Sequence, residues 1–257
     1  MGDIFRLDGK TAFVSGSRGH LGQAMASALA GAGAHVILNG RDDVKLAQQE
    51  ADLKAAGHSV SRAAFDVTDI AAVRDFFAGL TRLDVLVNNA VSMQVKPFAD
   101  LQPDDFAETY ASAVTTAFES ARAAHPALIA ARMAGGYASI INIASMYGQV
   151  SPDWRLYDDP GKQSPFHYGP AKAGLLQLTR HLAGEFGPQG IRVNALVPGP
   201  FPANAPSDFG VRLAGHTMMN RLGRADEIAG PLLFLSSPAS SYVTGASLNV
   251  DGGWTAW

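Results

Sequence analysis

A tyrosine and a lysine stand four residues apart in this chain, and a serine lies upstream of them. The three are Tyr168, Lys172 and Ser145. On a helix, a step of four residues places two side chains on one face, so the ammonium of Lys172 can lie beside the phenol of Tyr168. A nearby cation favours the phenolate, which otherwise forms only at about pH 10. The pattern indicates a phenol that exchanges protons at neutral pH. Taken alone, such a pair is more often a packed ring beside a solvated lysine, and the accompanying motifs favour the catalytic interpretation.

A glycine-rich turn follows the first expected strand. Glycines permit a tight turn and let the backbone approach a pyrophosphate, whose charge the next helix N-terminus stabilises. The alternative is an ordinary turn between a strand and a helix. We expect the whole turn to contact a dinucleotide: Ser15, Gly16, Ser17, Arg18, Gly19, His20, Leu21 and Gly22.

The residues after the second expected strand bear on the choice of cofactor. NAD-preferring folds commonly place an acid here, whereas this chain has Asn39 and then Arg41. Arg41, with Arg18 from the glycine turn, could hold the 2′-phosphate of NADP by charge-assisted bonds. The alternative is two solvated arginines, with Asp42 as an ion pair or helix cap. The sequence favours NADP(H), and NAD(H) is possible.

Composition narrows the class of protein. The 257 residues are 47% hydrophobic and 17% charged with a formal net charge of −3, which gives no reason to expect nucleic acid or an anionic membrane as partner. The absence of cysteine excludes disulfides and thiolate metal sites. The start lacks a secretory signal, so we expect a cytoplasmic protein. The seven histidines show no paired ligand spacing, so no metal is expected, and His167 is expected near solvent.

Strand and helix patterns alternate along the chain. They predict an α/β protein, residues 1–257 forming one doubly wound Rossmann-type domain of about seven parallel strands with helices on both faces. Ligands of such sheets bind beyond the carboxyl ends of the strands. The expected strands are 11–14, 35–38, 59–65, 84–87, 139–143, 191–196 and 246–250. The expected helices are 21–32, 44–56, 70–80, 103–124 with a break at Pro126 before a continuation to 132, 168–186 and 226–235.

Together these features resemble the short-chain dehydrogenase/reductase family over residues 10–253. The resemblance implies that Tyr168 exchanges a proton with the substrate oxygen, that Ser145 hydrogen-bonds this oxygen, and that Lys172 binds the nicotinamide ribose and lowers the pKa of Tyr168. It also implies a homodimer or homotetramer formed through helices 106–118 and 168–186. Further cofactor contacts are implied at Asn39, Asp66, Val67, Asn89, Ala90, Pro198, Gly199 and Phe201. Asp66 could instead cap a turn, and Asn89 could tie neighbouring strands together.

The resemblance implies an oxidoreductase that interconverts a ketone or aldehyde with an alcohol. One departure favours an alternative, a catalytically silent NAD(P)-binding sensor or partner-binding protein. Ala113 stands where most catalytic members have an asparagine that holds a water, and alanine has no polar side-chain atom. Ser112 or Thr116 could replace that group. Because Ser145, Tyr168 and Lys172 are all present, we expect activity.

The segment between Ser145 and Tyr168 has 22 residues, more than the family usually places there. We expect an insert at about residues 150–166 to form a flap on the substrate side, and a substrate loop at about 199–216. Expected substrate contacts are Tyr147, Trp154 and Phe201. The acids of the insert would suit hydroxyl-bearing substrates, whereas Phe201 would suit a hydrophobic ketone. Alternatively, the aromatic residues only pack the insert against the body.

Overall fold

One seven-stranded sheet, in the order β3-β2-β1-β4-β5-β6-β7, forms the centre of the molecule. The computed structural model describes residues 4–204 and 208–257. Every neighbouring pair of strands is parallel, which confirms the expected sheet. The strands are β1 Thr11–Val14, β2 His35–Gly40, β3 Val60–Ala64, β4 Val85–Asn88, β5 Ala138–Ile143, β6 Ile191–Pro198 and β7 Ser247–Val250.

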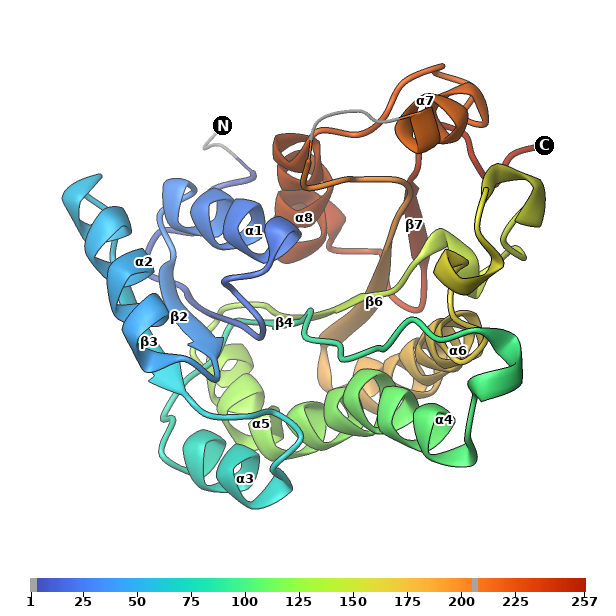
Figure 1. Ribbon diagram of the computed structural model, residues 1–257. Coiled ribbons are helices and arrows are strands. Elements are labelled where there is room, and N and C mark those ends of the chain that lie inside the picture. Colours follow the sequence, from blue (N-terminus) through green and yellow to red (C-terminus); the bar gives the residue numbers. More distant parts are fainter. Residues whose placement is uncertain (1–3, 205–207) are drawn as a thin grey trace.

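Helices cover both faces of this sheet (Figure 1). On one side lie α1 (His20–Gly31), α2 (Asp43–Ala55) and α8 (Ala229–Ser236). On the other lie α3 (Ile70–Ala78), α4 (Pro103–Tyr110), α5 (Thr116–Met133) and α6 (Tyr168–Phe186). A short helix, α7 (Asp208–Gly215), lies beyond the sheet beside the C-terminus. This arrangement is the predicted doubly wound Rossmann-type fold.

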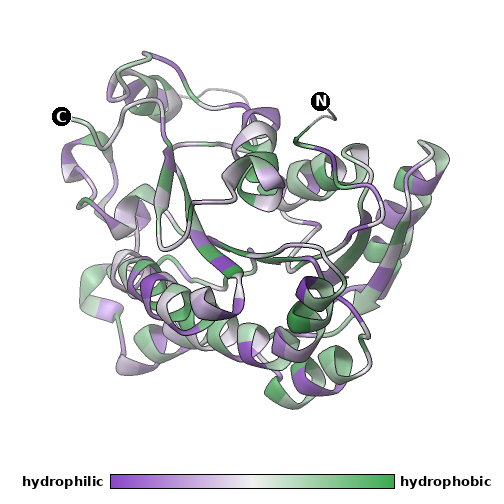
Figure 2. Cartoon of the chain, turned by 180° about the vertical axis from the view of Figure 1, so that it is seen from behind, coloured by the Kyte–Doolittle hydropathy of each residue, from purple (hydrophilic) through white to green (hydrophobic). Residues whose placement is uncertain are grey.

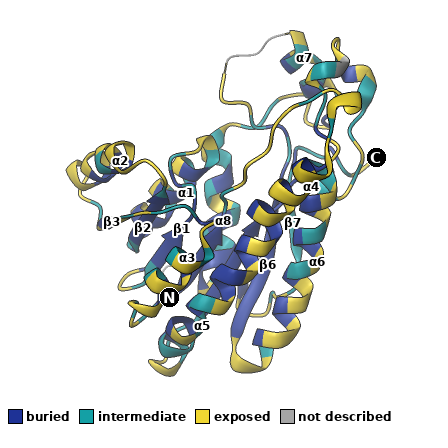
Figure 3. Ribbon diagram, turned by 60° about the horizontal axis from the view of Figure 1, so that its bottom comes forward, coloured by how far each residue is buried: buried dark blue, intermediate teal, exposed yellow. Residues whose placement is uncertain are grey.

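The central strands are mainly apolar on both faces, so a layer of helices must cover each face of the sheet. Every residue of β4, β5 and β6 is buried, as expected for parallel strands covered on both faces (Figure 3). The outer helices alternate between hydrophobic and hydrophilic residues (Figure 2), as helices with one face on a core do. Within the described ranges, no helix is long and apolar enough to cross a membrane.

The long helix before β5 differs from the expectation at two points. The predicted break at Pro126 is wrong, because α5 continues through Pro126 to Met133. The irregular point lies earlier, where a π-helix at Ala111–Thr115 joins α4 to α5. A π turn is wider than an α turn and is often found at functional sites. Here it places Ser112 in the wall of the cavity described next.

Candidate active site

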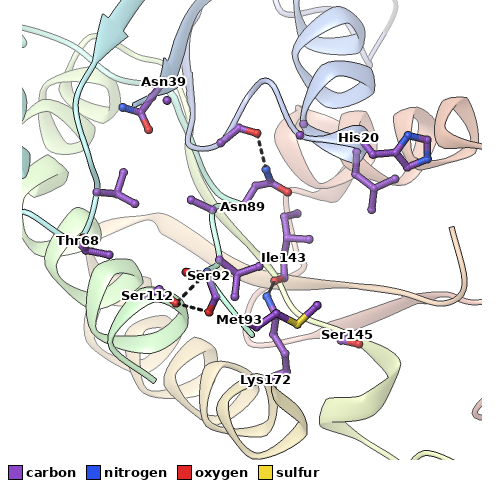
Figure 4. A pocket seen from close by; sticks show the side chains of 18 of the residues that line it. His20, Asn39, Thr68, Asn89, Ser92, Met93, Ser112, Ile143, Ser145 and Lys172 are labelled. Atoms are coloured by element: carbon purple, nitrogen blue, oxygen red, sulfur yellow. Dashed lines mark hydrogen bonds between the residues drawn. The ribbon is translucent and has the colours of Figure 1, made fainter. Parts of the chain in front are cut away.

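A cavity of about 910 Å³ opens at the carboxyl ends of the strands (Figure 4). Residues from the glycine turn and from the ends of β2, β4, β5 and β6 line it together with the start of α6. Most of the predicted cofactor residues lie in its wall: Gly16, Gly19, His20, Leu21, Gly22, Asn39, Arg41, Asp66, Val67, Asn89, Ala90, Tyr168, Lys172, Pro198, Gly199 and Phe201. Three predicted residues, Ser15, Ser17 and Arg18, are not part of this lining.

The glycine turn is held by its own backbone and by Asn89. Gly16 has a φ of +62°, a conformation that favours glycine. A Cβ on Gly22 would lie 2.2 Å from the Gly16 carbonyl oxygen, so no residue larger than glycine fits where the backbone at Gly22 passes Gly16. Asn89 Nδ2 donates to the carbonyls of Ser15 and Gly16 at 2.9 and 3.0 Å. Asn89 therefore ties the turn to the end of β4 and also lines the cavity.

The two serines of the turn bond to groups within the protein. The Ser15 hydroxyl accepts from the backbone N–H groups of Asn89 and Ala90 at 2.9 and 3.0 Å. Ser17 is fully buried, and its hydroxyl lies 3.2 Å from the Asn39 carbonyl and 3.0 Å from Gln49 Oε1. Both hydroxyls are thus committed within the protein, which explains why neither faces the cavity.

Of the two arginines expected to choose between NADP and NAD, Arg41 lines the cavity and Arg18 does not. The Arg41 side chain is 78% exposed, with Nη1 3.7 Å from Asp66 Oδ2. Asp42 accepts from the backbone N–H of Lys45 at 3.0 Å and so caps α2. Among the residues that the structure describes, Arg18 Nε is a buried donor with no hydrogen-bond partner. The exposed Arg41 guanidinium in the cavity wall fits a phosphate-bearing nucleotide, and the glycine turn carries a second arginine with a free donor.

Asp66 and Asn39 each make a structural contact as well as lining the cavity. Asp66 Oδ1 accepts from the backbone N–H and the hydroxyl of Thr68 at 2.9 and 2.8 Å. The turn-cap alternative for Asp66 is therefore present in the structure. Asn39 Nδ2 donates to the carbonyls of Ala63 and Phe65, which ties β2 to β3. Their side chains hold this part of the cavity wall in shape.

Ser145, Tyr168 and Lys172 meet in the same cavity. Ser145 follows β5 and is 7% exposed, Tyr168 is the first residue of α6, and Lys172 is one turn further along α6. Lys172 is 2% exposed, and its Nζ lies 5.7 Å from the centre of the Tyr168 ring. The same Nζ donates to the Ile143 carbonyl at 2.7 Å. A phenol, a hydroxyl and an ammonium thus converge beside the nucleotide cleft, where they can act on one oxygen atom.

The comparisons with known proteins agree with this geometry. A family model described as Enoyl-(Acyl carrier protein) reductase matches residues 17–255. The crystal structure of a short-chain type dehydrogenase/reductase from Mycobacterium marinum superposes with a TM-score of 0.86 and 31% identity, covering 98% of both chains. The chain belongs to the short-chain dehydrogenase/reductase family. It is therefore an NAD(P)-dependent oxidoreductase of alcohol and carbonyl groups.

Two further relatives span nearly the whole dehydrogenase/reductase. The gluconate 5-dehydrogenase of Gluconobacter oxydans (strain 621H) is 33% identical over 98% of this chain and 97% of its own. A gluconate 5-dehydrogenase from Burkholderia cenocepacia J2315, crystallised in complex with NADP and tartrate, has a TM-score of 0.87 and 31% identity. That alignment covers 99% of this chain and 98% of the other.

Burial dominates the electrostatics of this dehydrogenase/reductase site. It raises the pKa of Tyr168, and the hydrogen bond from Ser145 opposes this only in part. Burial also lowers the pKa of Lys172 to about 8. The expectation that Lys172 lowers the pKa of Tyr168 therefore does not describe the net effect here. The reason is desolvation, which penalises the phenolate and the ammonium alike.

The buried lysine predicts opposite pH effects on rate and stability. We expect the rate of carbonyl reduction to fall as pH rises through about 8, because Lys172 loses the proton that stabilises the phenolate. Between that pH and the ordinary lysine pKa of 10.5, the unfolded chain binds more protons at this position, so stability rises with pH. Initial rates measure the pH dependence of reduction, and denaturant unfolding between about pH 8 and 10.5 measures the pH dependence of stability. In Lys172→Met the rise in unfolding free energy should disappear, and its persistence would contradict the assignment.

The residue that replaces the expected asparagine is buried against α6. Ala113 is 4% exposed and packs with Ala171 and Leu175 in one apolar cluster. Thr116 does not line the cavity, because its hydroxyl donates to the Ser112 carbonyl. Ser112 does line it, with its hydroxyl bonded to the backbone N–H of Ser92 at 3.1 Å. Of the two suggested replacements, only Ser112 is in place.

The insert packs on the body of the enzyme. Trp154 stacks on Phe166 with ring centres 5.3 Å apart, and Tyr157 meets Phe209 of α7 at 5.0 Å. Arg212 of α7 donates from Nε to the Leu156 carbonyl at 2.8 Å. Figure 1 shows the insert, in yellow, beside α7. These contacts favour the packing alternative for the aromatic residues of the insert.

Of the three expected substrate contacts, only Phe201 lines the cavity. Tyr147 and Trp154 do not, because the Tyr147 hydroxyl lies 3.2 Å from that of Tyr157 and Trp154 is stacked within the insert. Contact of Tyr147 and Trp154 with substrate stays a prediction that this cavity lining does not support. Residues 205–207 of the expected substrate loop lie outside the described residues.

Several cavity residues were missed from the sequence. They share no motif, and only their position after a strand end or on the helix at 103–124 could have indicated them. These residues are Gly40, Phe65, Thr68, Val91, Ser92, Met93, Glu108, Ala111, Ile143 and Ala144. Over the described parts of the chain, no group of three or more histidine and acidic side chains is placed to hold a metal ion.

Proposed function

We propose that this protein is an NADP(H)-preferring oxidoreductase that interconverts a ketone or aldehyde with an alcohol, using Tyr168 as the proton donor and acceptor. The observation that carries the proposal is the convergence of Ser145, Tyr168 and Lys172 in the cavity that the glycine turn also lines. Family membership and the presence of all three groups support an enzyme over a catalytically silent binding protein.

The geometry suits the charge that develops during carbonyl reduction. A bound nicotinamide supplies the hydride. As the carbonyl oxygen gains negative charge, the Ser145 and Tyr168 hydroxyls donate to it, and these bonds strengthen in the transition state. The Tyr168 proton then moves to the oxygen, which completes the alcohol. Lys172, held by the Ile143 carbonyl at 2.7 Å, stabilises the phenolate that is left.

The rim of the cavity supports a preference for NADP(H). Asn39 and Arg41 stand at the end of β2, and the next acid, Asp42, is occupied as a helix cap. Arg41 is exposed at this point, and Arg18 carries an unsatisfied buried Nε among the described residues. Both arginines suit the 2′-phosphate. The NADP in the crystal structure of the Burkholderia relative supports the same cofactor.

Replacing Arg41 with alanine tests this preference. We expect Arg41→Ala to raise the KM for NADPH about tenfold, because a charge-assisted contact to the 2′-phosphate is lost, and to change the KM for NADH less than about twofold. Arg224→Ala is the matched control, since Arg224 is also exposed, pairs with Asp226 and lies outside the cavity lining. Equal losses for the two cofactors would reject the phosphate contact.

We also propose that the protein forms a homodimer or homotetramer in the cytoplasm. Exposed apolar side chains on α4 and α5, Phe106, Tyr110 and Phe118, support an interface there. A hollow of about 470 Å³ between α4 and α6 adjoins Phe106 and Tyr110. Analytical ultracentrifugation measures the assembly, and a monomer at micromolar concentration would reject it.

A panel assay tests the proposed reaction. NADPH absorbance is followed with hydrophobic ketones, sugars and polyol-derived ketones, and oxidation of the matching alcohols is measured with NADP. Turnover of any carbonyl supports the assignment, and the panel ranks substrate classes. No turnover across the panel in either direction would count against it.

A further inference from the structure

His167 lies directly before Tyr168 and is only 2% exposed. The expectation that this histidine lies near solvent is therefore wrong. Its ring occupies the junction of three segments: the start of α6, the helix α4, and the irregular segment 89–97 that follows β4. The Phe106 ring meets it edge-on, with centres 5.9 Å apart. A buried imidazole needs partners for both nitrogens, and this one has them.

The two ring nitrogens connect different segments. Nε2 lies 3.1 Å from the Gln94 carbonyl oxygen, and a carbonyl only accepts, so Nε2 carries a proton and donates. Nδ1 lies 2.9 Å from Oγ1 of Thr109 on α4. The Thr109 hydroxyl also lies 3.3 Å from the Ser92 carbonyl. His167 and Thr109 thus bridge segment 89–97 to both α4 and the first residue of α6.

Segment 89–97 is anchored at alternate residues. Ser112 bonds the backbone of Ser92, His167 bonds the backbone of Gln94, and Lys96 pairs with Asp105 at 2.5 Å. In the same segment the side chains of Val91, Met93 and Val95 are 38%, 46% and 52% exposed. Holding the backbone at Ser92 and Gln94 fixes how these neighbouring side chains are presented.

The presented side chains face the reaction site. Val91 and Met93 line the same cavity as Ser145, Tyr168 and Lys172. Figure 4 shows Met93 and Lys172 projecting into it together. An unanchored segment would let the Met93 side of the cavity move relative to the Tyr168 hydroxyl. Small displacements of a substrate from its reactive geometry reduce the rate strongly.

We propose that His167 is a positioning residue, which fixes the wall formed by Ser92, Met93 and Gln94 relative to Tyr168 and so sets where the substrate carbonyl lies. This inference rests on the proposed function of Tyr168. The side chain of His167 bonds to Gln94 of segment 89–97 and to Thr109 of α4, and its backbone continues directly into Tyr168. His167 therefore links the position of segment 89–97 to the position of the proton donor.

Two substitutions separate the two bonds. The amide of asparagine reaches the place of Nδ1, so His167→Asn retains the Thr109 contact and loses the Gln94 contact. The amide of glutamine reaches the place of Nε2, so His167→Gln retains the Gln94 contact. We expect His167→Asn to raise the substrate KM and lower kcat/KM about tenfold, with the KM for NADPH within about twofold. His167→Gln should recover most of this loss.

A second pair of variants guards against a general loss of folding. Thr109→Val removes the Nδ1 partner and the contact of the same hydroxyl with the Ser92 carbonyl, but it keeps the Gln94 bond of His167, so it should lose less activity than His167→Asn. His125→Asn is the matched control: His125 Nε2 also makes one hydrogen bond, to Gln189 Oε1 at 2.6 Å, on α5 and away from the cavity lining. It should leave the substrate KM unchanged. Equal kinetics for His167→Asn, His167→Gln and His125→Asn would overturn the proposal.

Hydrogen exchange gives a readout that needs no turnover. Amides of residues 91–96 should exchange about tenfold faster in His167→Asn than in the wild type, and at the wild-type rate in His125→Asn. Unchanged exchange in this segment overturns the anchoring role even if activity falls. If the wild type turned over no carbonyl, the proposed function would fail, and the exchange rates would still decide whether His167 holds the wall.

Discussion

Tyr168→Phe should lower kcat for carbonyl reduction by about a hundredfold to ten-thousandfold while the protein folds and binds NADPH as before. The substitution removes one hydroxyl and keeps the ring, so packing at the start of α6 is unchanged. The proton that completes the alcohol then has no donor, and the developing oxyanion keeps only the Ser145 hydroxyl. Initial rates with a substrate found in the panel assay, together with NADPH titration by fluorescence, measure both quantities.

A conservative tyrosine substitution elsewhere is the control for this result. Tyr242 is fully exposed and lies outside the cavity lining, so Tyr242→Phe should keep wild-type rates. Equal turnover by Tyr168→Phe and Tyr242→Phe would end the assignment of Tyr168. A large loss of NADPH affinity in Tyr168→Phe would also contradict it, because the argument gives the phenol a role in proton transfer.

Gly22→Ala should both destabilise the protein and weaken NADPH binding. The new methyl would lie 2.2 Å from the Gly16 carbonyl oxygen, which is backbone and cannot rotate away. The turn must then shift, at a cost of about 1–3 kcal/mol in the free energy of unfolding. Because the turn lines the cofactor cavity, we expect the Kd for NADPH to rise at least about tenfold. Denaturant unfolding and NADPH fluorescence titration measure the two effects.

The chain offers a matched control in the same helix. Gly31 is the last residue of α1, and a Cβ there would meet nothing within 4 Å. Gly31→Ala should therefore leave NADPH affinity unchanged and raise stability slightly, because alanine favours the helix. If Gly22→Ala behaved like Gly31→Ala, the close approach of Gly22 to Gly16 would not be needed for cofactor binding.

The sheet was predictable because its signals are local. Short buried runs such as Val85–Asn88 and Ala138–Ile143 alternate with longer amphipathic segments, and this pattern fixes a parallel sheet between helices. The pairing of Tyr168 with Lys172 was equally local, because a helix converts a four-residue step into one face. Positions that depend on local spacing were therefore placed well.

What the sequence missed depends on contacts between distant segments. The burial of His167 comes from Thr109 and Gln94, which lie far from it in the chain. The π-helix at Ala111–Thr115 carries no residue type that marks it, and the local rule that proline breaks helices failed at Pro126. The upward shift of the Tyr168 pKa follows from burial by the whole fold, which no short motif encodes.

The ion pairs of the insert have a consequence for the electrostatic field around it. Asp153 is matched by Arg155, Asp158 by Arg212, and Asp159 by Lys162 at 3.5 Å. Each carboxylate is thus neutralised close to where it stands, and little net field extends outward from this segment. Long-range attraction of charged molecules to this segment should therefore be weak, and added salt should scarcely alter the order of preference among substrates.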